Sequence, residues 1–303
     1  MPYLLLTLAA CFWGGNYVVG RVLVTQADPM VISEGRWVIT AVLLLCLYHH
    51  QVRNDWVKIK NSVGSICLLA IFGQILFPLT LYVGLQYTSS LNASIYLSAT
   101  PGMVLVMNKL LFNDSISKNN ILGVLFSTMG VIYLILQGNL TNLNSLSNIN
   151  QGDLWAMASA MSWACYSAFL RLKDKSIAGN AFVTVSAVLG SLMLLPIALV
   201  YFYFYPVENL AHYTDASFLL GLLYIAIFAS WLSYLFWNRG IAEIGASRGQ
   251  IYTHIIPLSG GIFSILFLHT EIANFHIIST LFIVIGIYLC SKKSTLLNCG
   301  EQK

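Results

Sequence analysis

Ten apolar stretches, separated by polar residues or by proline and glycine, run along the chain. Most approach the roughly 20 apolar residues that a helix needs to cross a bilayer. The pattern predicts an all-α integral membrane protein with ten transmembrane helices, or nine if one of the shorter stretches does not span. The stretches are 3–24, 30–48, 63–85, 88–111, 120–137, 152–170, 180–204, 217–238, 247–268 and 274–291.

Composition agrees with this pattern and narrows the function classes. Of 303 residues, 58% are hydrophobic and 9% are charged, against about 45–50% and about 25% in an ordinary soluble domain. A water-soluble globule is excluded, because its surface would need far more charged residues than these. Ten spans also leave no room for a large soluble enzyme domain. The six cysteines form no Cys-x-x-Cys pair, so we expect reduced thiols, no metal and no cofactor.

The positions of Lys and Arg predict the orientation. With the N-terminus inside, the cytoplasmic connections and the C-terminal tail hold 13 of the 15 basic residues, all but Arg21 and Arg36. The two longer external connections, 138–151 and 205–216, hold none, and Asp153 lies beside the first of them. Because basic residues favour cytoplasmic loops, we expect both termini in the cytoplasm of a bacterial inner (plasma) membrane. The net charge of +4 is then an insertion signal, and no nucleic-acid partner is expected.

Residue spacing also suggests an internal repeat. Trp13 and Arg21 recur at an offset of 150, and Gly84, Pro101 and Gly130 recur at an offset of 156. With five spans in each half, the second half would enter the membrane in the opposite orientation to the first. This is the inverted repeat of many secondary transporters. Chance matching of common residues is the alternative. The predicted units are a first repeat (1–138), an external linker (139–151), a second repeat (152–291) and a cytoplasmic tail (292–303).

Several short motifs carry a resemblance to a known family. They are Phe12-Trp13-Gly14-Gly15-Asn16, Arg36 and Leu81 to Ser90 running on to Pro101, then Gly152-Asp153-Leu154, Ser162-Trp163-Ala164, Tyr234 to Trp237, Pro257, Glu271 and Gly286 to Leu289. The chain resembles the EamA-type domain of the drug/metabolite transporter superfamily, twice over. One departure is Asp114-Ser115, where the second copy has Glu271. The resemblance implies a ten-helix alternating-access carrier that often exports amino acids, other metabolites or toxic compounds.

Polar and aromatic residues at helical spacing predict a cavity in mid-membrane. One face of the first helix and one face of the fourth carry such stripes, and aromatic residues of the sixth and eighth helices would wall the cavity. Packing and hydrogen bonding between helices are the alternative for each residue. The candidate substrate-binding residues are Trp13, Asn16, Tyr17, Asn92, Tyr96, Thr100, Trp163, Tyr166, Tyr234 and Trp237.

Four further residues are candidates for special roles. Arg36 lies deep in the second helix and either binds a substrate carboxylate or serves structure by capping carbonyls. His254 either couples transport to protons or is a satisfied interior histidine. Pro101 and Pro257 interrupt their helices and act as hinges or as static kinks.

These expectations combine into one function. We expect a secondary transporter that exports small metabolites, such as amino acids or amphipathic toxic compounds, by alternating access through a central cavity. A non-transporting membrane scaffold or sensor is the alternative. No hydrolase elbow, zinc-protease motif or phosphate loop occurs, so no enzyme is expected. The predicted partners are a small-molecule substrate and the lipid bilayer, with protons as a further candidate; the oligomeric state is not predicted.

Overall fold

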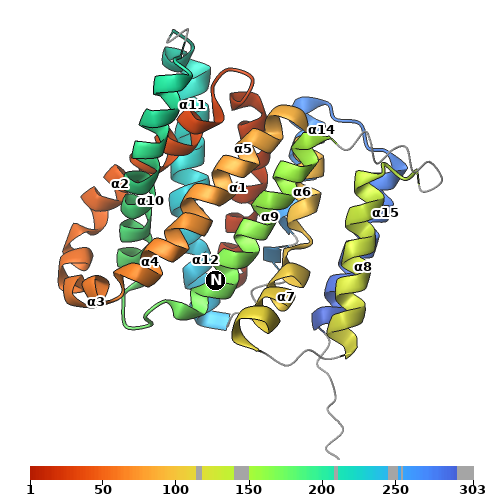
Figure 1. Ribbon diagram of the computed structural model, residues 1–303, viewed down its shortest axis with the longest axis horizontal. Helices are drawn as coiled ribbons and strands as arrows, with labels where there is room; N and C mark the ends of the chain where they lie inside the picture. Colours follow the sequence, from red (N-terminus) through yellow and green to blue (C-terminus); the bar gives the residue numbers. More distant parts are fainter. Residues whose placement is uncertain (114–117, 140–149, 208–210, 245–251, 254, 292–303) are drawn as a thin grey trace, which may run out of the picture.

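The computed structural model describes residues 1–113, 118–139, 150–207, 211–244, 252–253 and 255–291. Across those ranges the regular elements are all helices and no strand occurs, which confirms the predicted all-α class. The helices stand side by side as a bundle (Figure 1).

The first half of the chain supplies eight helices and one π-helical segment. The third predicted span is a continuous run of three elements whose middle one, η1, is π-helical. The elements are α1 (Pro2–Leu23), α2 (Pro29–Asn54), α3 (Trp56–Asn61), α4 (Val63–Ala70), η1 (Ile71–Leu76), α5 (Phe77–Tyr87), α6 (Ser90–Leu97), α7 (Thr100–Phe112) and α8 (Lys118–Ile135).

The second half repeats much of this order. A π-helical segment, η5, again lies inside one long helical run. The elements are α9 (Gln151–Phe169), the 3-10 turn η3 (Leu170–Leu172), α10 (Gly179–Phe204), the 3-10 turn η4 (Ala211–Thr214), α11 (Ala216–Tyr224), η5 (Ile225–Leu232), α12 (Ser233–Ile244), α14 (Ile255–Leu268) and α15 (Asn274–Ser291).

Local sequence explains where three of these helices begin. Asp28, Ser89 and Asn150 each precede a helix in extended conformation, and each side chain accepts a hydrogen bond from a backbone N–H two or three residues on. Such N-caps satisfy donors that have no partner within the helix.

Among the described residues, five helical segments are long and apolar enough to cross a membrane, or six if the bent pair α6 and α7 counts as one. The five are Pro2–Leu23, Pro29–Asn54, Val63–Tyr87, Gly179–Phe204 and Ala216–Gly240. The apolar parts of α8, α14 and α15 are shorter, at Ile121–Leu134, Ile255–Leu268 and Asn274–Gly286. These lengths show a multi-pass membrane architecture, and the count of ten spans stays a prediction.

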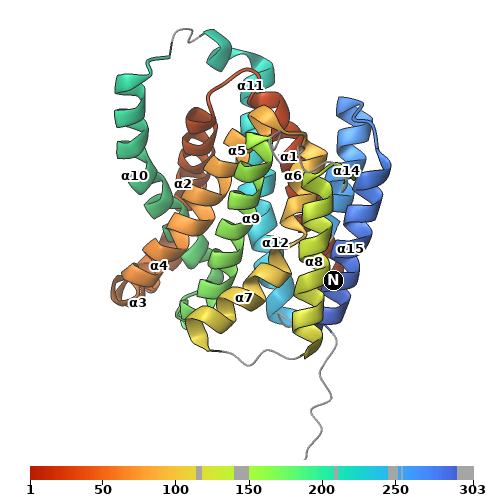
Figure 2. The same cartoon turned by 45° about the vertical axis from the view of Figure 1, so that its right-hand side comes forward.

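Contacts between the two halves dominate the packing. The most extensive helix pairs are α8 with α15, α2 with α10, α5 with α9, and α1 with both α14 and α12. The α8–α15 pair forms one edge of the bundle in both views (Figures 1 and 2). Gly130 and Gly286 allow its close approach, because a Cβ atom at Gly286 would lie 2.5 Å from the carbonyl oxygen of Gly123.

The two π-helical segments occupy corresponding places. Shifting Ile71–Leu76 by the 156 residues that separate Gly84 from Gly240 puts it at 227–232, inside η5. Single π-helical turns are rare and widen the helix locally. Their recurrence at one offset is the structural feature that best matches the predicted repeat.

The bundle has two chemically different ends. The basic end holds α3, η3 and the connection from η3 to α10, at the bottom of Figure 1. The opposite end holds the connection between α1 and α2, the break between α5 and α6, and the start of α9. These names are used below.

Candidate functional site

Five of the predicted site residues meet in one group of rings, called the aromatic cluster below: Trp13, Trp163, Tyr166, Tyr234 and Trp237. Trp13 of α1 is central, with ring centroids 5.8 Å from Trp163, 5.7 Å from Tyr234 and 5.3 Å from Trp237. Trp163 stacks on Tyr166 at 5.0 Å. One helix of the first half therefore contacts two helices of the second half through aromatic rings.

Arg36 lies beside this cluster and is 2% exposed. Its Nε donates to Ser230 Oγ, and its Nη1 donates to the Tyr82 hydroxyl at 3.0 Å. The Tyr82 hydroxyl donates onward to Asn16 Oδ1 at 3.0 Å. These four residues, Asn16, Arg36, Tyr82 and Ser230, are called the Arg36 network.

Trp37 joins the two groups. The Arg36 guanidinium carbon lies 5.0 Å from the Trp37 ring centroid, and the Trp37 and Tyr234 centroids are 6.2 Å apart. A cation over an aromatic face is attracted by the ring quadrupole. The network and the aromatic cluster are therefore one continuous polar and aromatic site between α1, α2, α5, α9 and the η5–α12 run.

The positive charge of Arg36 has no anionic partner among the described residues, since no such Asp or Glu lies within 4 Å of its guanidinium. Glu34 accepts a hydrogen bond from Ser191 of α10 at 2.7 Å and belongs to another contact. Burying an unpaired charge is costly unless hydrogen bonds or an added anion compensate it. The site is therefore suited to a ligand carboxylate or another anionic group.

The π-helical segment η5 positions this site. The Ala229 carbonyl accepts a hydrogen bond from Trp13 Nε1 at 2.9 Å and another from Arg36 Nη2 at 3.5 Å. Ser230 Oγ donates to the Ile225 carbonyl five residues earlier, at 3.0 Å. A π-helical turn interrupts the regular i to i−4 pattern, which leaves backbone carbonyls for side chains of neighbouring helices.

The other predicted residues of the first and fourth helices lie elsewhere. Asn92 donates to Thr88 Oγ1 at 3.4 Å, near the opposite end, and the structure does not place it in the aromatic cluster. Tyr17, Tyr96 and Thr100 are buried, and the hydroxyls of Tyr17 and Thr100 have no hydrogen-bond partner among the residues that the structure describes.

The candidate hinge and proton residues lie at three separate places in the chain. Helix α6 and the Gly102–Phe112 part of α7 are bent by 44°, and Pro101 lies at this break. Pro257 lies in the first turn of α14. His254 lies outside the described residues. The bend is a fact of the fold, and hinge motion and proton coupling at these positions stay predictions.

A hollow of about 450 Å³ opens at the opposite end and holds mostly polar side chains. Its lining includes Arg21, Tyr87, Thr88, Ser89, Ser90 and Thr270. Arg21 Nη1 donates to the carbonyls of Leu85 and Gln86 at the last turn of α5, so its charge is placed at a helix C-terminus, where a cation is favourable.

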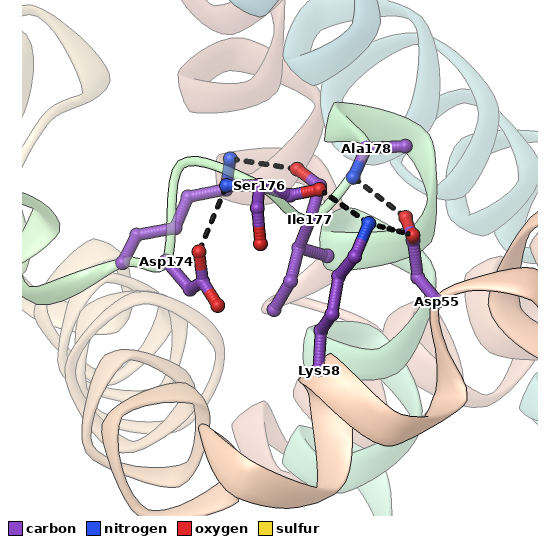
Figure 3. Close-up of polar contacts among 7 residues, drawn as sticks. Asp55, Lys58, Asp174, Ser176, Ile177 and Ala178 are labelled. Atoms are coloured by element: carbon purple, nitrogen blue, oxygen red, sulfur yellow. Dashed lines mark hydrogen bonds and ion pairs between the residues drawn. The ribbon is translucent and has the colours of Figure 1, made fainter.

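A charged contact joins the halves at the basic end (Figure 3). Asp55, after α2, accepts hydrogen bonds from Lys58 Nζ at 2.7 Å and from the Ala178 N–H at 2.8 Å. Lys58 Nζ also donates to the Ser176 carbonyl at 3.0 Å. The Lys58 ammonium and the Ala178 N–H lower the pKa of Asp55. The corner between α2 and α3 is therefore tied to the connection before α10.

Two neighbours in that connection titrate away from their ordinary values. The Ser176 N–H donates to Asp174 at 2.8 Å and lowers the pKa of this carboxyl. Partial burial lowers the pKa of Lys173, whose Nζ donates to the Ile177 carbonyl at 3.4 Å.

Over the described part of the chain, no group of three or more His, Cys, Asp or Glu is arranged to hold a metal ion.

Sequence reasoning missed Tyr82, Ser230 and Trp37 as parts of the site. Tyr82 lies in the motif before Gly84, and Trp37 adjoins Arg36, so both were visible in the sequence without a reason to select them. Ser230 is 194 residues from Arg36, and no periodic signal within one helix could pair them.

Comparison with known proteins gives concordant results. The sequence profile of the EamA-like transporter family matches residues 1–136 and 150–292. A Bacillus subtilis protein, "Uncharacterized transporter YyaM", is 27% identical over 297 residues, which cover 95% of this chain and 93% of that protein. The Arabidopsis thaliana "WAT1-related protein At3g02690, chloroplastic" is 26% identical over 285 residues, covering 92% of this chain and 66% of that protein. One crystal structure, 14% identical, superposes with a TM-score of 0.58 over 94% of both chains and shows a shared fold alone.

Proposed function

This chain belongs to the EamA-like transporter family, and we propose that it exports small metabolites through the site built by Arg36 and the aromatic cluster. The carrying observation is the buried Arg36, which lacks an acidic partner among the described residues and lies where the two halves meet. A transporter needs a polar site away from lipid, and a charge kept inside a bundle marks such a site.

The chemistry of the site favours an amino acid or an amphipathic compound with an anionic group. A carboxylate would take the free hydrogen-bonding capacity of the guanidinium, and an apolar or flat side chain would stack on the rings around Trp13. Tyr82 and Ser230 hold the guanidinium in place, so the cation is oriented before the ligand arrives.

Alternating access is the mechanism that fits contacts on both sides of the site. At the basic end, Asp55 and Lys58 tie the first half to the second. At the opposite end, Thr88 and Asp153 do the same. We propose that ten spans, arranged as inverted five-helix repeats, rock so that one set of contacts breaks while the other forms. The basic end would face the cytoplasm of the plasma (inner) membrane, with both termini on that side.

Counterflow in liposomes tests the binding site. The purified protein is reconstituted as wild type, Arg36→Met and Arg36→Lys, with a panel of labelled amino acids and amphipathic dyes. Arg36→Met should lower counterflow of anionic substrates about tenfold or more, since hydrogen bonds to charged groups contribute about 1.5–3 kcal/mol. Arg36→Lys should retain part of the flux, because it keeps the charge and loses the fork geometry.

Arg53→Gln is the matched control, because Arg53 is exposed at the end of α2. It should leave counterflow unchanged. Equal flux in wild type and Arg36→Met would reject Arg36 as a binding residue. No flux of any substrate in the wild type would instead favour a scaffold or sensor.

A further inference from the structure

A second buried polar group lies near the opposite end, outside the proposed substrate site. It consists of Thr88, Asn92, Asp153 and His276, and is called the Asp153 network below. Thr88, Asp153 and His276 are buried, although two of them carry titratable groups. They come from the end of α5, from α6, from α9 and from α15. The network thus joins two elements of the first half to two of the second.

The hydrogen bonds of this network run in one direction. His276 Nδ1 accepts from the Ala273 N–H at 3.0 Å, so this ring nitrogen carries no proton. The proton of the neutral ring is then on Nε2, which donates to Asn92 Oδ1 at 3.0 Å. Asn92 Nδ2 donates to Thr88 Oγ1, and Thr88 Oγ1 donates to Asp153 Oδ1 at 2.6 Å. Every donor points toward the Asp153 carboxylate, which ends the series.

No cation balances that carboxylate within the described structure, since no described Lys, Arg or His lies within 4 Å of it. The guanidinium of Arg21, at the same end of the bundle, donates to the carbonyls of Leu85 and Gln86 at the end of α5. From α6, the Tyr96 hydroxyl interacts electrostatically with Asp153. Tyr87 precedes Thr88, and only its carbonyl is engaged nearby.

The histidine at the other side of the network has few charged neighbours. Glu271 and His269, in the connection before α15, are exposed. The ring of Phe275 packs against His276 with centroids 4.1 Å apart. A protonated His276 would set two donors, its Nδ1–H and the Ala273 N–H, against each other. The neutral ring is therefore an orienting group, and the carboxylate is the group able to take up a proton.

The same residues hold the two halves together. Besides the Thr88–Asp153 bond, Asn150 Nδ2 donates to the Tyr87 carbonyl at 2.6 Å. The backbones meet where a Cβ atom at Gly152 would lie 2.6 Å from the Thr88 nitrogen and 2.8 Å from the Gly84 carbonyl. A change of charge at Asp153 would thus act on the contact that closes this end.

We propose that Asp153 is a proton-binding site that couples this transporter to the proton gradient. The proposal rests on the function proposed above. A proton entering at the opposite end binds one Asp153 oxygen and converts the carboxylate to the neutral acid. The charge-assisted bond from Thr88 becomes a neutral and weaker one, and the two halves separate at this end. Loss of the proton restores the bond and closes it.

Transport measurements with and without a pH gradient test the coupling. Wild-type protein in liposomes should transport faster with a gradient. Asp153→Asn, which resembles the protonated acid and cannot lose a proton to close this end, should abolish that stimulation and also slow counterflow without a gradient. Glu34→Gln is the matched control, because Glu34 is a half-buried acid whose Oε1 accepts from Ser191; it should keep the stimulation. Equal stimulation in wild type and Asp153→Asn would overturn the proposal.

Infrared spectroscopy of the purified protein separates this proposal from the proposed substrate site, because it needs no transport. A carboxyl carbonyl band that titrates in the wild type should be missing from Asp153→Asn and present in Glu34→Gln. If Asp153→Asn does not fold, Thr88→Val keeps the acid and removes its donor, so the same band should change frequency. A band that none of these variants alters would reject Asp153 as the proton site, whatever the flux experiments show.

Discussion

The two ends of the bundle both join the first half of the chain to the second, but they do so with different chemistry. At the basic end, the contact is an ion pair at the corner between α2 and α3, where Lys58 is about half exposed. At the opposite end, the buried Asp153 carboxylate accepts a hydrogen bond from the Thr88 hydroxyl, and the backbones of Gly84 and Gly152 are in close contact. Exposed ion pairs contribute about 0–1 kcal/mol, whereas hydrogen bonds to buried charges contribute about 1.5–3 kcal/mol.

This difference implies different responses of the two ends. Water and salt reach the half-exposed Lys58, so the basic end should open at low cost. At the opposite end the Asp153 carboxylate is buried, so this contact should open only when its charge or its backbone contact changes. In an alternating-access carrier, opening of the opposite end would therefore control the transport cycle, and the basic end would open or close in response.

The largest expected effect comes from the backbone contact at the opposite end. Gly152→Val places side-chain atoms against the Thr88 nitrogen and the Gly84 carbonyl, which are backbone atoms and cannot rotate away. Overpacking of this kind costs about 3 kcal/mol. Thermal unfolding in detergent should show a much lower midpoint. Gly179→Val is the control, because nothing lies within 4 Å of a Cβ atom there, and equal losses in both variants would contradict the tight contact.

The next effect concerns the hydroxyl of Thr88. Thr88→Val keeps the shape of the side chain and leaves the Asp153 carboxylate without this donor. The expected loss of stability is about 2 kcal/mol, because the lost bond is to a charged, buried acceptor. Thr25→Val removes a hydroxyl at the same end that is exposed and bonds only to the Val22 carbonyl. Thermal unfolding of the two variants should differ, and a loss no larger than that of Thr25→Val would place the Thr88 bond among weak surface contacts.

The helices themselves were largely predictable from the sequence. The stretch 3–24 corresponds to α1 (Pro2–Leu23), and 180–204 corresponds to α10 (Gly179–Phe204). The length of an apolar run predicts the length of a membrane helix, because the helix must be apolar wherever it crosses lipid. The length of an apolar stretch does not show how its backbone is hydrogen-bonded. The π-helical segments η1 and η5 could therefore not be predicted from the sequence.

The site was only partly predictable, for a related reason. Helical spacing selected Trp13 and Asn16 on one face, and the structure puts both next to second-half or α5 side chains. Residue spacing within one helix does not show which other helix packs against it. Tyr82 and Ser230, which lie on neighbouring helical segments, were therefore not predicted. Asp153 stands at the start of the predicted stretch 152–170, beside an external connection; the structure buries it, because the first turn of α9 packs against the end of α5.

A smaller effect is expected at the cap of α9. Asn150 accepts from the Gly152 N–H and donates to the Tyr87 carbonyl, so it both caps a helix and joins the halves. Asn150→Ala should cost about 1 kcal/mol, the usual value of an N-cap. Ser89→Ala removes the cap of α6, which lies within the first half. Hydrogen exchange should then rise on both sides of the contact in Asn150→Ala and only in α6 in Ser89→Ala; exchange confined to α9 would contradict a joining role for Asn150.

The smallest expected effect on stability at neutral pH concerns Asp55. Its pH dependence distinguishes the basic end from the opposite end. The Lys58 ammonium and the Ala178 N–H lower the pKa of this carboxyl in the folded protein. A lowered pKa gives stability that is fully present above the ordinary Asp value, about 3.9, and is lost as the pH falls through the lowered value. The basic end should therefore keep its contact across the neutral and mildly acidic range and lose it only in stronger acid.

Asp55→Asn tests this dependence, because the amide cannot ionise. The melting temperature of the wild type relative to the variant should be constant above about pH 5 and should fall toward the variant below about pH 4, where Asp55 takes up a proton. Glu271→Gln is the control, since Glu271 is an exposed acid in the connection before α15. Added salt should shrink the difference between wild type and Asp55→Asn and leave that between wild type and Thr88→Val unchanged, because only the exposed pair is screened. A salt-independent contribution of Asp55 would mean that the basic end is as well shielded as the opposite end, and the contrast between the two ends would fail.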